Sequence, residues 1–125
     1  MIHLDTCVLI DALTGARRSA PALRALIEHG ERVSFCTLVL YEWRRGPRVA
    51  RELEVQEALF PGGDAVPFGS REAALASDLY RRIRRPRGRE IDLAIAACAI
   101  AREARLWTLN PVDFRDVPGL DLLRT

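Results

Sequence analysis

The sequence of 125 residues contains no lysine: all 19 of its basic residues are arginine. This absence excludes several classes of protein whose chemistry depends on a lysine side chain. A Walker-type phosphate-binding loop, a response-regulator receiver domain and a Schiff-base enzyme each need one. The net charge is only +2, so the distribution of the charges along the chain is more informative than their total.

Long apolar runs and paired cysteines are also missing. No apolar stretch reaches the roughly 18 residues that a membrane span needs. The short apolar stretch after Met1 has no basic leader, so we expect no signal peptide. Cys7, Cys36 and Cys98 lie far apart without a CxxC pair, which favours reduced thiols and a cytoplasmic location. The length and the 49% hydrophobic content predict one domain over residues 1–125.

Apolar patterning along the chain predicts strands that alternate with helices. Strands are predicted over residues 2–5, 32–36, 106–109 and 120–123, with a short one inside 61–69. Helices are predicted over residues 8–13, 19–30, 37–46, 48–60, 70–83 and 90–104. Such alternation is typical of an α/β fold with a central, mainly parallel sheet flanked by helices. Ligands of such sheets bind beyond the carboxyl ends of the strands.

Asp5 and Asp92 lie in strongly apolar stretches. Asp5 ends the first predicted strand and is soon followed by the apolar residues VLI, a costly place for a carboxylate without a partner. Asp92 is the only charged residue in 91–101, in the first turn of a helix so apolar that we expect it to be buried. The helix dipole alone could explain Asp92, because it favours an acid in the first turn.

Glu42 and Asp113 occupy similar positions. Glu42 shares one face of its predicted helix with the apolar Leu38 and Val39. Asp113 follows the strand predicted at 106–109 and has an apolar residue on each side. Each acid has a structural explanation of its own, since Glu42 can pair with a nearby arginine and Asp113 can close an Asx turn.

Taken together, these four acids come from separate segments that an α/β fold can bring to one edge of the sheet. If they converge, several like charges share one cleft, which is unfavourable unless a cation lies among them. Hard oxygen ligands favour Mg²⁺ or Mn²⁺. Seven glutamates instead fall on polar faces among arginines and are expected to be solvated: Glu28, Glu31, Glu52, Glu54, Glu57, Glu72 and Glu103.

Residues 81–89, RRIRRPRGR, contain six arginines and no acid, and they lead directly into the helix of Asp92. An arginine-rich helix end can simply be solvated. The Pro-Gly-containing loop, however, presents arginines near the predicted acidic site. A cation held by carboxylates and surrounded by guanidinium groups matches a phosphodiester substrate. Four arginines are predicted to contact its phosphates: Arg84, Arg85, Arg87 and Arg89.

Four segments together resemble the PIN domain, and most closely the VapC-type toxins of bacterial toxin–antitoxin pairs. They are LDTCVLID near the N-terminus, YEW at 41–43, EIDLAIAACA at 90–99 and TLNPVDF at 108–114. The resemblance covers essentially the whole chain. It implies a parallel sheet wrapped by helices and an Mg²⁺- or Mn²⁺-dependent ribonuclease, often acting on structured RNA such as transfer RNA. It also implies a cognate antitoxin and a homodimer.

The resemblance also implies roles for the acids. Asp5, Glu42 and Asp92 match the first three acids of the family, while the fourth position falls on Asn110 or Asp113. We favour Asp113, because only a carboxylate brings a full negative charge to a metal. Asp5, Asp92 and Asp113 are then the predicted metal ligands, and Glu42 orients a second ion or its water.

Three further residues are predicted to support the site. Thr6 and Thr108 match hydroxyl residues of the family's motifs, and Asn110 is expected to orient Asp5 or a metal-bound water. The chain departs from the family at Cys7, where asparagine is usual. This departure affects a local hydrogen bond and not the predicted metal ligands.

Three alternatives remain open. A phosphatase with Asp5 as nucleophile usually needs a second aspartate at position 7, where this chain has Cys7, and a lysine, which it lacks. A catalytically silent PIN scaffold that binds RNA or protein would be marked by the loss of a core acid, and all are present. An α/β domain with purely structural acids is the third alternative.

Overall fold

The central sheet is parallel and has the strand order β2-β1-β3-β4 in a computed structural model that describes residues 1–124. Its strands are β1 (Ile2–Leu4), β2 (Val33–Ser34), β3 (Arg105–Trp107) and β4 (Asp121–Leu122). In the register of the central pair, Leu4 lies opposite Trp107. The carboxyl ends of β1 and β3 therefore meet at the same edge of the sheet.

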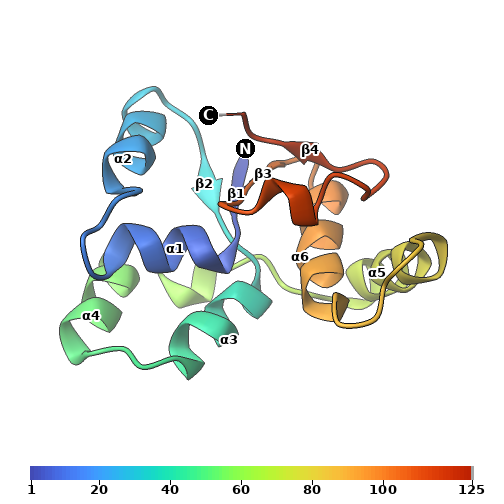
Figure 1. Ribbon diagram of the computed structural model, residues 1–125. Coiled ribbons are helices and arrows are strands. Elements are labelled where there is room, and N and C mark those ends of the chain that lie inside the picture. The colour runs from blue at the N-terminus through green and yellow to red at the C-terminus, as the bar shows by residue number, and fades with distance from the viewer. Residues whose placement is uncertain (125) are drawn as a thin grey trace.

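Helices enclose this sheet, which confirms the predicted α/β fold. They are α1 (Thr6–Leu13), α2 (Ala20–Glu28), α3 (Thr37–Arg45), α4 (Ala50–Leu59), α5 (Ser70–Arg82) and α6 (Glu90–Ala101), with short 3-10 helices η1 (Gly62–Asp64) and η2 (Pro111–Asp113). In Figure 1, α1 to α4 lie to one side of the strands and α5 and α6 to the other. None of the helices in the described part of the chain has the length and apolar character of a membrane span.

The core is built around β1 and α6. All three residues of β1 are buried, and eight of the 12 residues of α6 are buried. This confirms that the most apolar predicted helix lies inside the protein. Because α6 is surrounded on nearly all sides after its first turn, Asp92 is the last charged residue before the buried part of the helix.

The strands are shorter than their apolar patterns predict. The strand predicted over 32–36 pairs only at Val33–Ser34, and the short strand predicted inside 61–69 is reduced to one bridge between Cys36 and Val66. Strand length depends on pairing with a partner far away in the sequence, and β2 and β4 each pair on one side only. An apolar run shows where a strand is buried, but it does not show over how many residues the neighbouring strand pairs with it.

One predicted surface acid is buried. Glu72 is only 7% exposed, although its neighbours in sequence suggested a solvated side chain. It lies in the first turn of α5, where its carboxylate accepts a hydrogen bond of 3.1 Å from the backbone N–H of Gly69. Glu72 therefore binds the backbone N–H of the N-cap residue, which is the part of a capping box that a glutamate at the third helical position supplies.

The buried His3 predicts an acid-sensitive contribution to stability. Its side chain is 1% exposed, and its Nε2 atom has no hydrogen-bond partner among the described residues. Burial, with smaller effects of Arg102 and the N-terminal amino group, lowers the pKa of His3 from 6.5 to about 4. Below pH 6.5 the imidazole of His3 takes up a proton in the unfolded chain but stays neutral in the folded protein. Stability therefore falls as the pH drops from 6.5 to about 4.

We therefore expect His3 to reduce the free energy of unfolding by roughly 3 kcal/mol between neutral pH and about pH 4. Urea unfolding of the wild type and of His3→Leu over this range measures the effect. The difference between the two proteins isolates His3 from the carboxylates, which titrate in both. Parallel pH profiles would show that His3 does not resist protonation in the folded state.

Candidate active site

Asp5 lies at the carboxyl end of β1 and is the N-cap of α1. It is 7% exposed, and three donors surround its carboxylate. Oδ1 accepts from the Thr6 backbone N–H at 2.9 Å, and Oδ2 accepts from the Thr108 hydroxyl at 2.7 Å and from the Cys7 thiol at 3.4 Å. Burial raises the pKa of Asp5 in spite of these hydrogen bonds, and the nearby Glu42 raises it further.

Thr108 reaches Asp5 because β1 and β3 run in parallel, side by side. Thr108 directly follows β3, as Asp5 follows β1, and the Asp5 backbone N–H donates to the Trp107 carbonyl at 2.9 Å. The Thr108 hydroxyl also accepts from the Asn110 backbone N–H at 3.1 Å. Thr108 therefore connects Asp5 with the turn that follows β3, as its predicted supporting role requires.

Cys7 supplies a neutral hydrogen bond at the position where asparagine is usual in the family. Its thiol donates to Asp5 Oδ2 and accepts from the Leu109 backbone N–H, at 3.4 Å in both cases. Burial and the Asp5 carboxylate raise the pKa of Cys7 to about 11, so the thiol stays protonated at neutral pH. The sequence marked Cys7 only as a departure, whereas in the structure it helps to hold Asp5.

Glu42 projects from α3 toward the N-terminus of α1. Its Oε1 atom accepts a hydrogen bond of 2.6 Å from the Thr6 hydroxyl, and its other oxygen lies 3.8 Å from the Arg45 guanidinium. The Glu42 side chain is 23% exposed. Thr6 therefore binds two of the predicted acids at once, Asp5 through its backbone N–H and Glu42 through its hydroxyl.

Asp92 lies in the first turn of α6 and is half-buried. Burial is the main cause that raises its pKa to about 6, followed by the charges of Asp5, Asp113 and Glu42, while Arg89 opposes the shift. Three carboxylates can raise the pKa of a fourth only when all of them lie within electrostatic reach. Asp5, Asp113 and Glu42 therefore lie within electrostatic reach of Asp92.

Asp113 is the last residue of η2 and is exposed, as is Asn110 at the start of the same turn. The turn is anchored by Phe114, which is 2% exposed in the core. Asn110 contacts the site through its backbone, by the hydrogen bond to Thr108. The charge of Asp113, in contrast, contributes to the raised pKa of Asp92.

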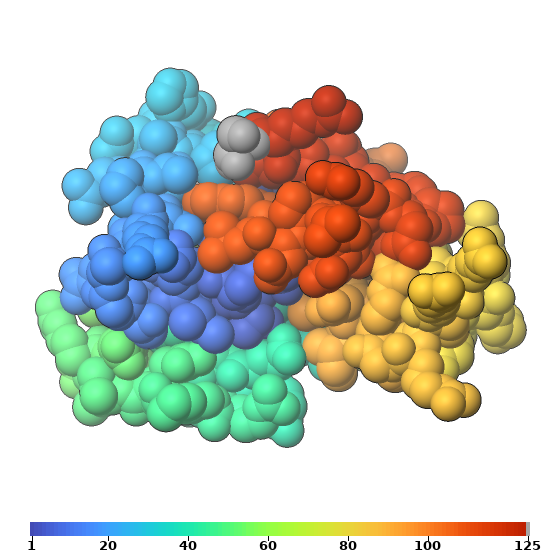
Figure 2. All heavy atoms as spheres, in the orientation of Figure 1, coloured from blue at the N-terminus to red at the C-terminus, as the bar shows by residue number. Residues whose placement is uncertain are grey.

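The arginine-rich loop lies next to this turn. A groove of about 520 Å³ is lined by Arg84, Arg85, Arg89, Val112, Asp113 and Asp116. The loop around residues 84–89 and the segment around 110–116 lie side by side on the face shown in Figure 2. The exposed Arg84 and Arg85 are thus adjacent to the acidic site, and Arg87 is exposed on the same loop.

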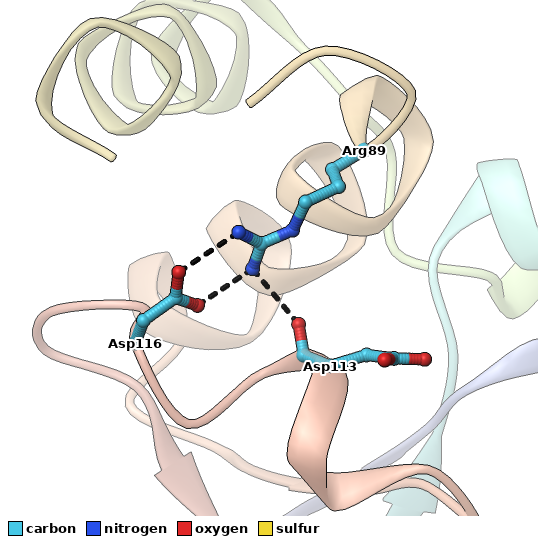
Figure 3. A network of polar contacts seen from close by, with 3 residues as sticks. All are labelled: Arg89, Asp113 and Asp116. Atoms are coloured by element: carbon cyan, nitrogen blue, oxygen red, sulfur yellow. Dashed lines mark hydrogen bonds and ion pairs between the residues drawn. The ribbon is translucent and has the colours of Figure 1, made fainter. Parts of the chain in front are cut away.

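Arg89 differs from the other arginines because it is bound within the protein. Its guanidinium forms a two-pronged ion pair with Asp116, at 2.6 and 2.8 Å, and donates to the Asp113 carbonyl at 2.8 Å (Figure 3). The sequence predicted a phosphate-binding role for Arg89 and assigned none to Asp116. No local pattern joins these two residues, because 27 positions separate them.

The donors of the site fit a hard divalent cation. Within residues 1–124, no three His, Cys, Asp or Glu side chains are grouped closely enough to form a ready-made metal site. Mg²⁺ does not require such a cage, because it usually keeps several waters and binds through one or two carboxylates. A cation bound by Asp5, Asp92 and Asp113 would offset both the burial of Asp92 and the repulsion from its neighbours, which together raise its pKa.

Comparisons with known proteins identify relatives over nearly the whole chain. The family model of the PIN domain matches residues 2–120. Ribonuclease VapC19 of Mycobacterium tuberculosis is 34% identical over 119 residues, which cover 94% of each chain.

Among solved structures, VapBC2 from Rickettsia felis bound to a DNA fragment from its promoter has a TM-score of 0.76 at 21% identity and covers 98% of each chain. FitAcB from Neisseria gonorrhoeae has a TM-score of 0.71 at 22% identity, covering 99% of this chain and 97% of the other. At this level of identity, the two structures support the fold.

The raised pKa of Asp92 predicts that its charge destabilises the metal-free protein. The folded pKa of about 6 exceeds the ordinary value of 3.8, so the ionised form costs stability above pH 6 and the cost fades as the pH falls toward 3.8. We expect Asp92→Asn to raise the free energy of unfolding near pH 7.5 by roughly 1 to 2 kcal/mol, allowing for solvent screening.

Urea unfolding in EDTA measures this gain, which should shrink at about pH 4.5. Asp78→Asn is the matched control, because Asp78 also lies on a helix but pairs with Arg82 at the surface. The control should be neutral or slightly destabilising. A loss of stability in Asp92→Asn at both pH values would instead assign Asp92 a structural capping role.

Proposed function

The chain belongs to the PIN-domain family, and we propose that it is a divalent-metal-dependent endoribonuclease, the toxin of a toxin–antitoxin pair. One observation carries the proposal: Asp5, Asp113 and Glu42 lie close enough to Asp92 to add to the rise of its pKa, which burial and these charges together bring to about 6. A protein that folds against this repulsion gains a site for a cation. The relative named as a ribonuclease supports cleavage of RNA.

In this proposal the acids divide into ligands and a positioning group. Asp5, Asp92 and Asp113 would hold Mg²⁺ or Mn²⁺, which when bound acidifies water and screens charge on a phosphate. Glu42 orients the attacking water, and the Thr6 hydroxyl fixes its carboxylate. Thr108 and Cys7 donate hydrogen bonds to Asp5 that favour its ionised form and partly offset the effect of burial on its pKa. Asn110 adds a neutral amide at the edge of the site.

The substrate is proposed to be RNA, with structured RNA such as transfer RNA as one candidate. Arg84 and Arg85 line a groove together with Asp113. A phosphodiester chain in this groove would have guanidinium groups on the phosphates that flank the cleaved one. Arg87, on the same exposed loop, extends this basic surface.

The partner is proposed to be a cognate antitoxin that covers the acidic site. Several carboxylates in an open site form a complementary surface for an arginine side chain of another protein. The solved structures with this fold include one named as a toxin–antitoxin complex, from Klebsiella pneumoniae. We further propose that the single domain works as a homodimer in the cytoplasm.

Loss of a carboxylate should abolish metal-dependent cleavage. We expect Asp5→Asn and Asp92→Asn each to lower the rate of RNA cleavage in Mg²⁺ by more than roughly 100-fold, because even the outer partners of metal ligands contribute 10- to 100-fold. EDTA should have the same effect on the wild type. Glu54→Gln, on the exposed face of α4, should cleave normally.

These measurements also test the alternatives. Cleavage that survives EDTA would contradict a metal-dependent mechanism. RNA binding without any cleavage by the wild type would favour the catalytically silent scaffold. Circular dichroism of each variant confirms that the fold is kept.

The basic loop should determine the salt dependence of RNA binding. We expect Arg84→Gln combined with Arg85→Gln to reduce the slope of log K against log salt by about 1.4, since each single-strand phosphate contact contributes about 0.7. Binding is measured in EDTA, so that the RNA stays intact.

The control removes the same charge elsewhere, by Arg18→Gln combined with Arg24→Gln. These exposed arginines lie at α2, which Figure 1 shows far from the loop that joins α5 to α6. If both double variants flatten the slope equally, the effect comes from total charge and not from this groove.

A further inference from the structure

We propose that Arg89 is a positioning residue that acts through Asp116: it holds the turn carrying Asp113 against the start of the helix carrying Asp92. The inference rests on the proposed function, because it assigns Asp113 to the metal site. It gives Arg89 a different role from Arg84 and Arg85. We call the three residues Arg89, Asp113 and Asp116 the latch.

The latch joins two segments that lie on either side of the groove and are far apart in the sequence. Arg89 is the N-cap of α6, three residues before Asp92, and Asp113 and Asp116 follow β3 on the far side of the groove. One guanidinium spans the gap with three hydrogen bonds, two to the Asp116 carboxylate and one to the Asp113 carbonyl. Such a bidentate, charge-assisted pair fixes direction as well as distance.

The contact with Asp113 leaves its carboxylate free. Arg89 binds the main-chain carbonyl of Asp113, and in Figure 3 the Asp113 carboxylate points away from the guanidinium. Asp113 is exposed at the end of a single 3-10 turn, so burial does not hold it in place. A bond to its backbone therefore sets the position of the acid without using its charge.

Asp116 compensates the charge of Arg89. The ion pair holds the pKa of Asp116 below its usual range and raises that of Arg89. The Arg89 side chain is only 22% exposed. A phosphate could bind both prongs of this guanidinium only by displacing Asp116. The Arg89 guanidinium is thus already bound within the protein. Arg84 and Arg85 line the groove, and neither side chain forms a hydrogen bond or an ion pair with another residue of 1–124.

Positioning and simple charge make opposite predictions for Arg89→Gln, which is therefore the decisive variant. If only charge matters, Arg89→Gln removes a cation and strengthens Mn²⁺ binding, while Asp116→Asn removes an anion and weakens it. If the latch positions Asp113, both variants weaken Mn²⁺ binding by roughly 10-fold or more, as outer partners of metal ligands do. The double variant should then lose no more than either single variant, because both remove one interaction.

Calorimetric titration of Mn²⁺ into the full chain measures these affinities. Hydrogen exchange of residues 110–117 should become faster in each latch variant, with little change in the melting temperature. The matched control is the Arg105–Glu31 pair, which has a distance of 2.9 Å and lies at the opposite edge of the sheet, where β3 begins. Arg105→Gln and Glu31→Gln should leave Mn²⁺ affinity unchanged.

Binding of RNA in EDTA separates the latch from a phosphate contact. If Arg89 binds phosphate, Asp116→Asn frees it and strengthens RNA binding, while Arg89→Gln weakens it; this pair of results would overturn the inference. Unchanged Mn²⁺ affinity in both latch variants, with normal binding by the wild type, overturns it while leaving the proposed function intact. A wild type that binds no Mn²⁺ contradicts the proposed function, and the inference with it.

Discussion

The candidate site depends on the parallel pairing of β1 with β3. This register places Thr108 beside Asp5, so that a hydroxyl from one strand end solvates the carboxylate at the other. A buried carboxylate without such donors would cost several kcal/mol or take up a proton. With Thr6 and Cys7 donating as well, the sheet edge can hold an acid almost out of water, and the other three acids are arranged around it.

Repulsion among these acids is the second organising constraint. Asp5 and Glu42 are held from opposite sides of Thr6, so neither can move away from the other without losing a hydrogen bond. Asp92 is fixed by the buried helix α6, and its pKa is raised first by burial and then by the charges of the other three acids. Relief of this repulsion would contribute to the binding of a cation at the proposed site, at the expense of the stability of the metal-free protein.

The sequence predicted the order of the elements and singled out four acids for the site, because apolar periodicity and misplaced carboxylates are local signals. It did not predict features that depend on distant partners. The ends of β2 and β4 depend on pairing across the sheet, and Asp116 acquires a role only through Arg89. Glu72 is different: its capping position was visible three residues after Gly69, but the surrounding arginines suggested a solvated face.

The same distinction explains why the sequence left the choice between Asn110 and Asp113 open. Asp5, Glu42 and Asp92 sit on a strand end and two helices, whose geometry follows from local pattern and core packing. Asp113 sits on an exposed turn, where the backbone can present residue 110 or residue 113 to the site. In this chain Asn110 is tied to Thr108 through its backbone, and Arg89 binds the carbonyl of Asp113 from the other side. The contact of Arg89 that fixes this turn thus comes from a residue distant in the sequence. For this reason the sequence motif could identify the turn but could not decide between residues 110 and 113.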